Sequence, residues 1–329
     1  MQRIKIIDYI KALFIIFVVV THTEVIPGDS IVQLFITAQV VPGFMLLSGY
    51  TYALSSQKKT LRQMCNTRKM MKAICRYLVP AIIAYLIYLV GWYIRGDYRL
   101  TIWDIVYRFV MGLYGPGGYY GGIMLQFVLL APVLFFIVRK YNQFGVLIIG
   151  VINFLFEIIV RIWNMHEVVY RVLIFKYLLV IAMGMYLCLN RMKKWHKKYL
   201  VLCWLIGVVY LILPYCTSYQ YHLFTLWSET SMMDTFFIFP MMCVALLKFD
   251  KLEGANGIAK VIEYIGKASY HIMYVQLIYF VGVKDALYTM IDLQKMGSLF
   301  EVVFALAVSL VGGVIFHKLD TKIFGVIYR

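Results

Sequence analysis

Long apolar runs recur along the whole chain, and they constrain its fold more than any other feature. A run of about 18 or more apolar residues is long enough for a helix that crosses a hydrocarbon core about 30 Å thick. The composition agrees with many such runs, because 63% of the 329 residues are hydrophobic and only 15% are charged. Soluble domains carry about 25% charged residues. The sequence therefore predicts an all-α polytopic membrane protein.

We predict about ten transmembrane helices and infer their orientation from the basic residues. The predicted spans cover residues 6–26, 31–54, 74–94, 119–138, 144–163, 172–190, 199–214, 232–249, 264–283 and 298–317. Of the 32 Lys and Arg residues, 23 fall in the loops and termini on one side of these spans and 7 on the other side. Because cytoplasmic loops are enriched in Lys and Arg, both termini are predicted to be cytoplasmic. The basic residues of the cytoplasmic loops account for the net charge of +16, so we expect no nucleic-acid partner.

The connections between the predicted spans are short. The longest are residues 55–73, 95–118, 215–231 and 250–263. Each is too short to fold alone, so we expect a single domain over residues 1–329. The first apolar run contains Asp8 and has no small-x-small cleavage site before Pro27, which argues against a cleavable signal peptide. The six cysteines show no CxxC motif and no histidine at ligand spacing, so we predict no disulfide and no metal site.

Three ionisable residues share one face of the first predicted helix. With Asp8 at 0° and about 100° per residue, Lys11 falls at about 300° and His22 at about 320°. Glu24 falls at about 160° and points away. Asp8 and His22 are separated by about 21 Å along a regular helix.

Ionisable groups inside membrane spans usually face the bundle interior and mark functional sites. We therefore take Asp8, Lys11 and His22 as candidate catalytic residues, with His22 as the base. The alternative is structural. In that case Asp8 and Lys11 lie at the membrane interface, where they can pair at i, i+3, and His22 caps the helix end.

The second predicted span contains an unusual number of Pro, Gly and Ser residues in the stretch VVPGFMLLSGYTYAL. We expect Pro42-Gly43 to interrupt the helix and Ser48-Gly49 to loosen it again, as is tolerated where backbone faces protein or a cavity. Ser48 and Tyr50 are candidate residues for binding or supporting a substrate. The alternative is that the small residues form a helix-packing interface.

A basic stripe leads into the third predicted span. Arg68, Lys72 and Arg76 are spaced i, i+4, i+8, and Lys69 lies beside them. This spacing places the three cations on one helix face, which suits the phosphates of a cytosolic, nucleotide-like donor. Binding of lipid headgroups, or topology alone, would explain the same residues.

Further polar and aromatic residues are candidates for supporting a substrate. Asn153, Glu157 and Arg161 form an i, i+4 stripe, in which we expect Glu157 and Arg161 to pair and to face the bundle.

Other candidates lie at the predicted outer side. Glu229 and Asp234 flank the start of the eighth span. The tyrosines there can form an aromatic belt or stack on sugars, and they are Tyr119, Tyr120, Tyr219 and Tyr221. The Gly-rich residues 115–122 predict a turn that enters the fourth span.

Four stretches, in this order, resemble the integral membrane acyltransferase-3 family, and most of all its fucose 4-O-acetylase-like members. They are IDYIKALFIIFVVVTH, PGFMLLSGYTYAL, RKMMKAICRYLVP and IGKASYHIMYVQ. The resemblance covers essentially the whole chain. It implies a ten-helix enzyme that lies in a cell membrane. In a bacterium, this is the cytoplasmic membrane. Such an enzyme transfers an acyl group, usually acetyl from cytosolic acetyl-CoA, to a hydroxyl of an extracytoplasmic or lipid-linked glycan.

The resemblance also assigns roles to individual residues. His22 matches the catalytic histidine, and Asp8 and Lys11 match the acidic and basic residues that precede it. The family's Pro-x-Phe-x-x-x-Ser-Gly motif matches Pro42, Phe44, Ser48 and Gly49. Its basic motif, the implied site for acyl-CoA, matches Lys69, Lys72 and Arg76, with Arg68 adjacent.

Two positions depart from the family's pattern. Relatives often carry a histidine where this chain has Gly118, and many carry one where it has Gln276. Both departures argue against a mechanism with a second histidine at these positions and leave His22 as the base.

The sequence thus predicts a membrane-embedded O-acetyltransferase whose partners are acyl-CoA, a glycan or lipid-linked sugar, and membrane lipids. The alternative is a non-enzymatic transporter or flippase of glycans or lipid-linked sugars. A transporter would explain the spans and the interior charges, but not the basic stripe or the base at the end of the first helix.

Overall fold

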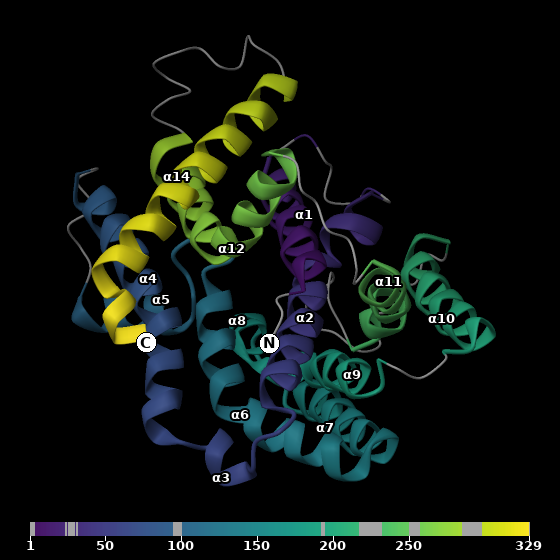
Figure 1. Ribbon diagram of the computed structural model, residues 1–329. Helices are drawn as coiled ribbons and strands as arrows, with labels where there is room; N and C mark the ends of the chain where they lie inside the picture. The colour runs from purple at the N-terminus through teal and green to yellow at the C-terminus, as the bar shows by residue number, and fades with distance from the viewer. Residues whose placement is uncertain are drawn as a thin grey trace. The chain divides into compact units, whose positions relative to one another are not determined.

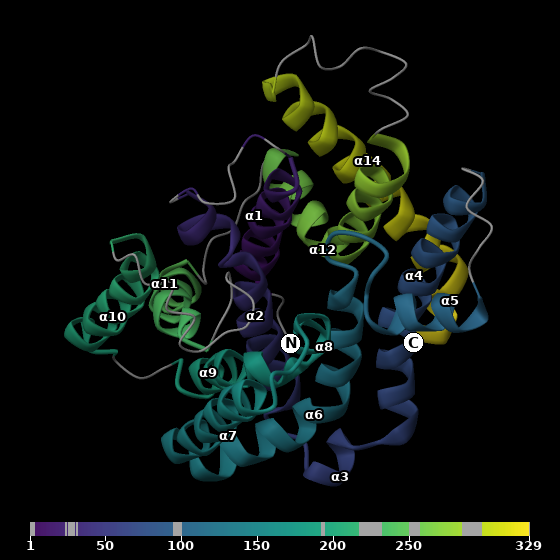
Figure 2. The same ribbon diagram turned by 180° about the vertical axis from the view of Figure 1, so that it is seen from behind.

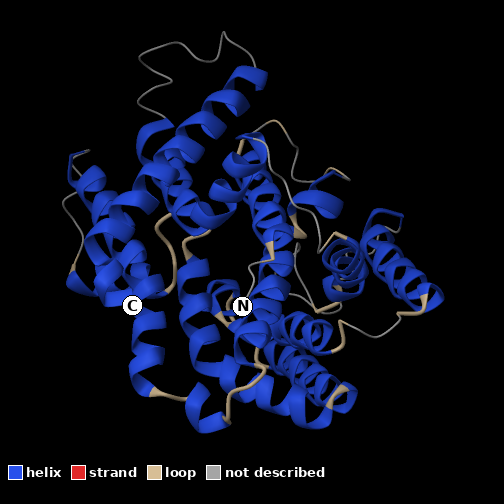
Figure 3. Cartoon of the chain, viewed as in Figure 1, coloured by secondary structure: helices blue, strands red, loops and turns tan. Residues whose placement is uncertain are grey.

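The computed structural model describes residues 4–23, 25, 30, 32–94, 101–191, 195–216, 232–249, 257–284 and 298–328. All regular structure in these ranges is helical, which confirms the predicted all-α class (Figure 3). The longer α-helices are α1 (Lys5–Thr21), α2 (Val40–Ser56), α4 (Thr67–Ile94), α6 (Tyr119–Tyr141), α7 (Gln143–Ile162), α9 (Leu178–Leu189), α10 (Lys197–Cys216), α11 (Asp234–Lys248), α12 (Gly257–Ile278) and α14 (Ser298–Tyr328). The short elements are η1 (Gln33–Thr37), α3 (Leu61–Met64), α5 (Ile102–Val110), α8 (Glu167–Val172), η2 (Ile174–Tyr177) and η3 (Tyr279–Val283).

Several helices are built to cross a membrane. Five segments within the described residues are long and apolar enough, and they are Gln33–Ser56, Leu61–Ile94, Tyr119–Tyr141, Gln143–Ile162 and Leu299–Tyr328. Their outward side chains are apolar, since Val90, Leu147 and Val311 are all more than half exposed. Large exposed apolar surfaces of this kind are typical of contact with lipid. Within the part of the chain that the structure describes, the helices at the other predicted spans do not meet the same criterion of length and apolarity.

The helices group into two compact units, and each unit combines segments that are distant in sequence. The first unit comprises Met1–Ile7, Ile31–Asn66 and Leu129–Glu253. The second unit comprises Asp8–Ser30, Thr67–Val128 and Gly254–Arg329. Helix α6 contributes its first part to the second unit and its remainder to the first unit.

In the first unit, glycines allow α2 and α9 to pack closely (Figure 1). A Cβ atom on Gly49 of α2 would collide with the carbonyl oxygen of Ile181 in α9. A Cβ atom on Gly184 of α9 would collide in the same way with the carbonyl oxygen of Leu46 in α2. Small residues at such crossings let two backbones approach. The predicted small-residue packing interface is therefore confirmed.

The predicted weak points of the second span are wrong in position. The irregularity lies before Pro42, where η1 ends at Thr37 and α2 begins at Val40. Pro42 sits in the first turn of α2, where its missing N–H does not cost a helical hydrogen bond. The helix then runs through Ser48 and Gly49 without a break. Ser48 bonds its own helix, since its Oγ donates to the carbonyl of Phe44 at 2.8 Å.

In the second unit, α12 packs against α14 and α4 (Figure 2). Glycines again mark the closest approaches. Gly266 of α12 lies against the backbone of Asp8 in α1, and Gly313 of α14 lies against the backbone of Ile272 in α12. A side chain at either position would separate the helices. These two contacts set the register of α12 against α1 and α14.

The glycine-rich turn before α6 is confirmed. Gly112, Gly115 and Gly117 have φ angles of 63°, 138° and 81°, which L side chains rarely adopt. The turn is fixed from two sides, because Tyr114 donates to the carbonyl of Gly118 at 3.1 Å and Gln276 of α12 donates to the carbonyl of Pro116 at 3.5 Å. Helix α6 then begins at Tyr119.

The same connection contains a helix that was not predicted. In α5, Thr101 and Asp104 form a reciprocal capping box, with the Thr101 N–H donating to Asp104 at 3.0 Å. The hydrogen bonds from Thr101 lower the pKa of the Asp104 carboxyl. Ile102 and Trp103 are 79% and 82% exposed, so α5 presents an apolar surface. An amphipathic helix of this kind suits the membrane interface.

Candidate functional site

The structure retains the predicted polar face of the first helix. Helix α1 is regular from Lys5 to Thr21, which preserves the predicted angular relation of Asp8 and Lys11. Asp8 is buried and Lys11 is half-buried. His22 is the first residue beyond the helix, and its N–H still bonds the carbonyl of Val19 at 3.2 Å. All three candidate residues belong to the second unit.

The end of α1 is capped by threonines rather than by His22. Thr21 donates to the carbonyl of Phe17 at 2.8 Å, and Thr23 donates to the carbonyl of Val20 at 2.7 Å. The carbonyl of Val20 is one of the last four in α1, which have no partner inside the helix, so the bond from Thr23 is a cap. The catalytic role of His22 stays a prediction.

The His22 imidazole is half-buried against an aromatic ring. Phe280 of η3 lies edge-on to it, with ring centroids 6.0 Å apart and an interplanar angle of 64°. Within the described ranges, no side chain forms a hydrogen bond with this imidazole. Glu24 lies outside the described residues. The contact with Phe280 thus restricts the orientation of the ring.

The basic stripe lies in the first turns of α4, which begins at Thr67. Arg68, Lys69 and Arg76 are exposed and Lys72 is half-buried. Because α4 is helical throughout, the i, i+4, i+8 spacing does place three cations on one face. The guanidinium of Arg76 donates to the backbone carbonyl of Tyr328, at the end of α14, at 3.4 Å. The exposed guanidinium and ammonium groups are suited to phosphate oxygens.

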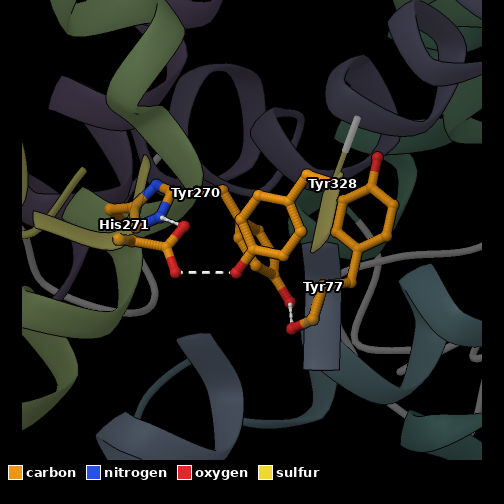
Figure 4. A network of polar contacts seen from close by, with 5 residues as sticks. Tyr77, Tyr270, His271 and Tyr328 are labelled. Carbon is orange, nitrogen blue, oxygen red and sulfur yellow. Dashed lines mark hydrogen bonds and ion pairs between the residues drawn. The ribbon is translucent and has the colours of Figure 1, made fainter. Parts of the chain in front are cut away.

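A polar network that the sequence did not suggest joins α12 to α14 (Figure 4). His271 Nε2 and Asp320 Oδ2 are 3.0 Å apart, and the Tyr328 hydroxyl donates to Asp320 Oδ1 at 2.7 Å. His271 and Asp320 are only 6% and 3% exposed. The ring of His317 lies beside His271, at a centroid distance of 4.8 Å.

Sequence reasoning missed this network for a definite reason. The last span was predicted to end at residue 317, but α14 continues to Tyr328 and carries Asp320 into the packed region. His271 was visible as an ionisable residue within a predicted span. The rule that such residues mark sites would have found it.

Tyrosine hydroxyls link α12 to α4 in the same unit. The Tyr270 hydroxyl donates to the carbonyl of Tyr77 at 2.9 Å (Figure 4), and it lies 2.9 Å from the Tyr274 hydroxyl. The ring of Tyr120 is 6.2 Å from that of Tyr270, and Tyr119 is buried. The predicted contact of Tyr119 and Tyr120 with a sugar stays a prediction.

The first unit holds a separate buried ionic cluster. Both carboxylate oxygens of Glu157 lie 3.1 Å from the hydroxyl of Tyr170. The Lys176 ammonium lies over the rings of Tyr170 and Tyr177, at 5.0 and 4.9 Å from their centroids. Glu157 and Lys176 are each 2% exposed. Asn153, one turn before Glu157, accepts the Leu179 N–H at 3.1 Å.

The predicted pair of Glu157 with Arg161 is wrong. Arg161 is exposed near the end of α7, whereas Glu157 turns inward to Tyr170. Residues at i, i+4 are neighbours on a helix, but the cost of burying a guanidinium favours the exposed position for Arg161. Sequence spacing alone could not identify Tyr170, because it lies on α8, across a turn.

The remaining predicted residues are placed as follows. Asp234 begins α11 and is buried, and it accepts a hydrogen bond from Gln39 at 2.8 Å. Tyr50 is 1% exposed within α2. Tyr219, Tyr221 and Glu229 lie outside the described residues. Among the residues that are described, no group of three or more His, Cys, Asp or Glu side chains is arranged to hold a metal ion.

Comparison with known families gives one match. A family model described as an acyltransferase domain matches residues 4–318, which is nearly the whole chain. Comparisons with curated proteins and with solved structures give no match.

Proposed function

Because this chain belongs to the acyltransferase-3 family of membrane acyltransferases, we propose that it moves an acetyl or similar short acyl group from cytosolic acyl-CoA to a hydroxyl of an extracytoplasmic or lipid-linked glycan. The observation that carries the proposal is the match over residues 4–318, which includes His22 and the basic stripe. An acyltransferase needs a base near the reacting hydroxyl and a binding site for its donor. The second unit supplies candidates for the base and for the donor-binding site.

The proposed topology has ten spans with both termini in the cytoplasm. The two units then form a single acyltransferase domain in the cytoplasmic membrane of a bacterium. The start of α4 faces the cytosol, and His22 lies toward the opposite side. About 21 Å of helix α1 separates Asp8 from His22, and the long arm of acyl-CoA is suited to such a path.

The donor is held by the basic stripe. The residues proposed to bind its phosphates are Arg68, Lys69, Lys72 and Arg76. Three of the four are exposed, so a soluble ligand can reach this surface of α4. On α1, Asp8 is buried and Lys11 is half-buried. They order the path that the arm of acyl-CoA takes from the basic stripe toward His22.

His22 acts as the general base. Its neutral imidazole takes the proton of the acceptor hydroxyl, and the hydroxyl oxygen forms an ester bond with the acyl carbon. The bond between that carbon and the sulfur of CoA breaks, and the proton passes to the departing thiolate. In a variant of this mechanism, His22 carries the acyl group briefly before the acceptor attacks. The edge of Phe280 holds the imidazole in one orientation in either case.

The residues that are candidates for binding or supporting the acceptor substrate divide into two groups. Ser48, Tyr50 and Glu157 are engaged within the first unit, so they support the helices rather than touch the acceptor. Tyr120 of the second unit is less buried, and we assign contact with the glycan to it, whereas Tyr119 is buried and Arg161 is exposed within the first unit.

The proposal is tested by mass analysis of cell-surface glycans. Cells that produce the wild-type chain should carry one acyl group more per repeat than cells that lack it. The variant His22→Ala should lose this group while still inserting in the membrane. His196→Ala is the matched control, because His196 is exposed and belongs to the other unit. Acylation that persists in His22→Ala would contradict the assignment of the base.

The transporter alternative predicts a different result with purified protein. A transporter or flippase should not bind acetyl-CoA, whereas the proposed enzyme should bind it through the basic stripe. Calorimetry with acetyl-CoA therefore separates the two functions, and absence of binding would favour transport.

A further inference from the structure

The end of α14 contacts both α12 and α4 through a continuous set of polar contacts, and Figure 4 shows the part of it from His271 to Tyr328. His271 of α12 lies 3.0 Å from Asp320 of α14, and Asp320 accepts the hydroxyl of Tyr328 at 2.7 Å. The backbone carbonyl of Tyr328 then accepts the guanidinium of Arg76 on α4 at 3.4 Å. Arg76 is a member of the basic stripe. The set therefore begins in a buried helix contact and ends at an exposed cation.

The buried part of this set is firmly fixed. Asp320 is 3% exposed, and a carboxylate in that position is tolerated only when it is hydrogen bonded and faces a suitable partner. Both of its oxygens are engaged, one by His271 and the other by Tyr328. Gly313 brings α14 against Ile272, the neighbour of His271, so α14 packs closely on α12 beside this pair.

Helix α4 needs such support at this point. Pro80 lies inside α4 and has no N–H, so the carbonyl of Arg76 loses its i+4 hydrogen bond. Two contacts from neighbouring helices reinforce the turn. Tyr270 of α12 donates to the carbonyl of Tyr77 at 2.9 Å, and Arg76 itself reaches the end of α14.

We propose that His271, Asp320 and Tyr328 are positioning residues, which orient Arg76 toward the phosphates of the acyl donor. The inference rests on the proposed function, since it assumes that the basic stripe binds acyl-CoA. A flexible arginine loses conformational freedom when it binds a phosphate, and ordering it beforehand strengthens binding. Arg68 and Lys72, on the same face, make no comparable contact in the described part of the chain. Arg76 is thus a member of the stripe that the fold orients.

The test compares two donors that differ only in the nucleotide. Acetyl-CoA carries the phosphates that Arg76 would bind, and acetyl-pantetheine lacks the nucleotide. Asp320→Asn and Tyr328→Phe should each raise the KM for acetyl-CoA about five- to tenfold, the size expected for one lost ordering contact. The kcat with acetyl-CoA, and both constants with acetyl-pantetheine, should stay within about twofold of wild type.

A second arm tests the route through Arg76. In an Arg76→Gln background, adding Asp320→Asn should raise the KM no further, because the residue that it orients is already absent. Asp104→Asn is the matched control, since Asp104 is an exposed carboxylate in a helix cap. Tyr328→Phe retains the backbone carbonyl and most of the packing, so it remains informative if Asp320→Asn folds poorly.

The outcomes are distinguishable. Equal losses with both donors, or additive losses with Arg76→Gln, would mean that the network only stabilises the fold, and would overturn the inference. Unchanged constants in both variants would overturn it as well. If the wild-type protein transfers acetyl from neither donor, the proposed function itself fails.

Discussion

The two units place their ionisable residues in different surroundings. In the first unit, Glu157 and Lys176 are each 2% exposed and are enclosed by the hydroxyl and rings of tyrosines. In the second unit, the contacts of Asp320 lead outward to an exposed arginine, and His22 is half-buried against Phe280. Enclosed charges have no access to a soluble ligand, whereas charges that reach the surface do. The comparison fits a stabilising role for the first cluster and is the reason that we propose the second unit for the chemistry.

The largest expected effect is on the rate of the reaction. His22→Gln should lower kcat by about 10²–10⁴, the usual contribution of a general base. The melting temperature of the detergent-solubilised protein should change little, because the His22 side chain is half-buried and the helix end is bonded by Thr21 and Thr23. A residual rate near that of wild type would remove the chemical role from the second unit.

The second effect concerns stability in the first unit. Tyr170→Phe removes the hydroxyl that donates to the buried Glu157, and hydrogen bonds to charged groups are worth about 1.5–3 kcal/mol. The free energy of unfolding should fall by this amount, while the KM and kcat of the folded fraction stay unchanged. Denaturation of the purified protein measures the first quantity. A changed KM for acetyl-CoA with unchanged stability would reverse the roles of the two units.

Close helix packing in the first unit gives the third prediction. Gly184→Ala places a methyl group against the carbonyl of Leu46 and should cost about 1–3 kcal/mol of stability. Gly91→Ala on α4 is the matched control, since a Cβ atom there meets nothing within 4 Å. The control should be neutral or slightly stabilising, because alanine is the better helix former. Equal melting temperatures for the two variants would show that α2 and α9 do not pack through Gly184.

The smallest effect is expected in α5, outside both buried clusters. Thr101→Ala removes the cap and should make amide hydrogen exchange in the first turn about fivefold faster. Because the pKa of Asp104 is lowered in the folded helix, its contribution to the cap is present above the usual pKa of aspartate and is lost as pH falls through the lowered value. Acidification should therefore lower the protection factor of these amides, which is the intrinsic exchange rate at each pH divided by the observed rate, in the wild type, and should lower it less in Thr101→Ala. Transfer activity should not change in either case.

The sequence predicted the structure correctly wherever the prediction depended on residues that are close together in the chain. Apolar runs predicted the helices, the glycines predicted the turn before α6, and residue spacing placed Arg68, Lys72 and Arg76 on one face of α4. The face shared by Asp8 and Lys11 also follows from helix periodicity alone, because α1 is regular.

Tertiary pairings could not be predicted in this way. Glu157 was paired with Arg161 by spacing, but its partner Tyr170 comes from a different helix. His271 and Asp320 meet because Gly313 sets the register of α14 on α12 and because α14 continues beyond residue 317. Neither the register of α14 on α12 nor the length of α14 can be predicted from a local sequence pattern. The same applies to Phe280, whose contact with His22 depends on how η3 follows α12.

The most direct measurement compares the two units in one preparation of proteoliposomes. Transfer of labelled acetyl from acetyl-CoA to the glycan acceptor and the melting temperature are recorded together for wild type, His22→Gln and Tyr170→Phe. The account predicts that His22→Gln loses transfer at a normal melting temperature, and that Tyr170→Phe melts lower but retains transfer in its folded fraction. Transfer that persists in His22→Gln would contradict the account, as would its loss in a stably folded Tyr170→Phe.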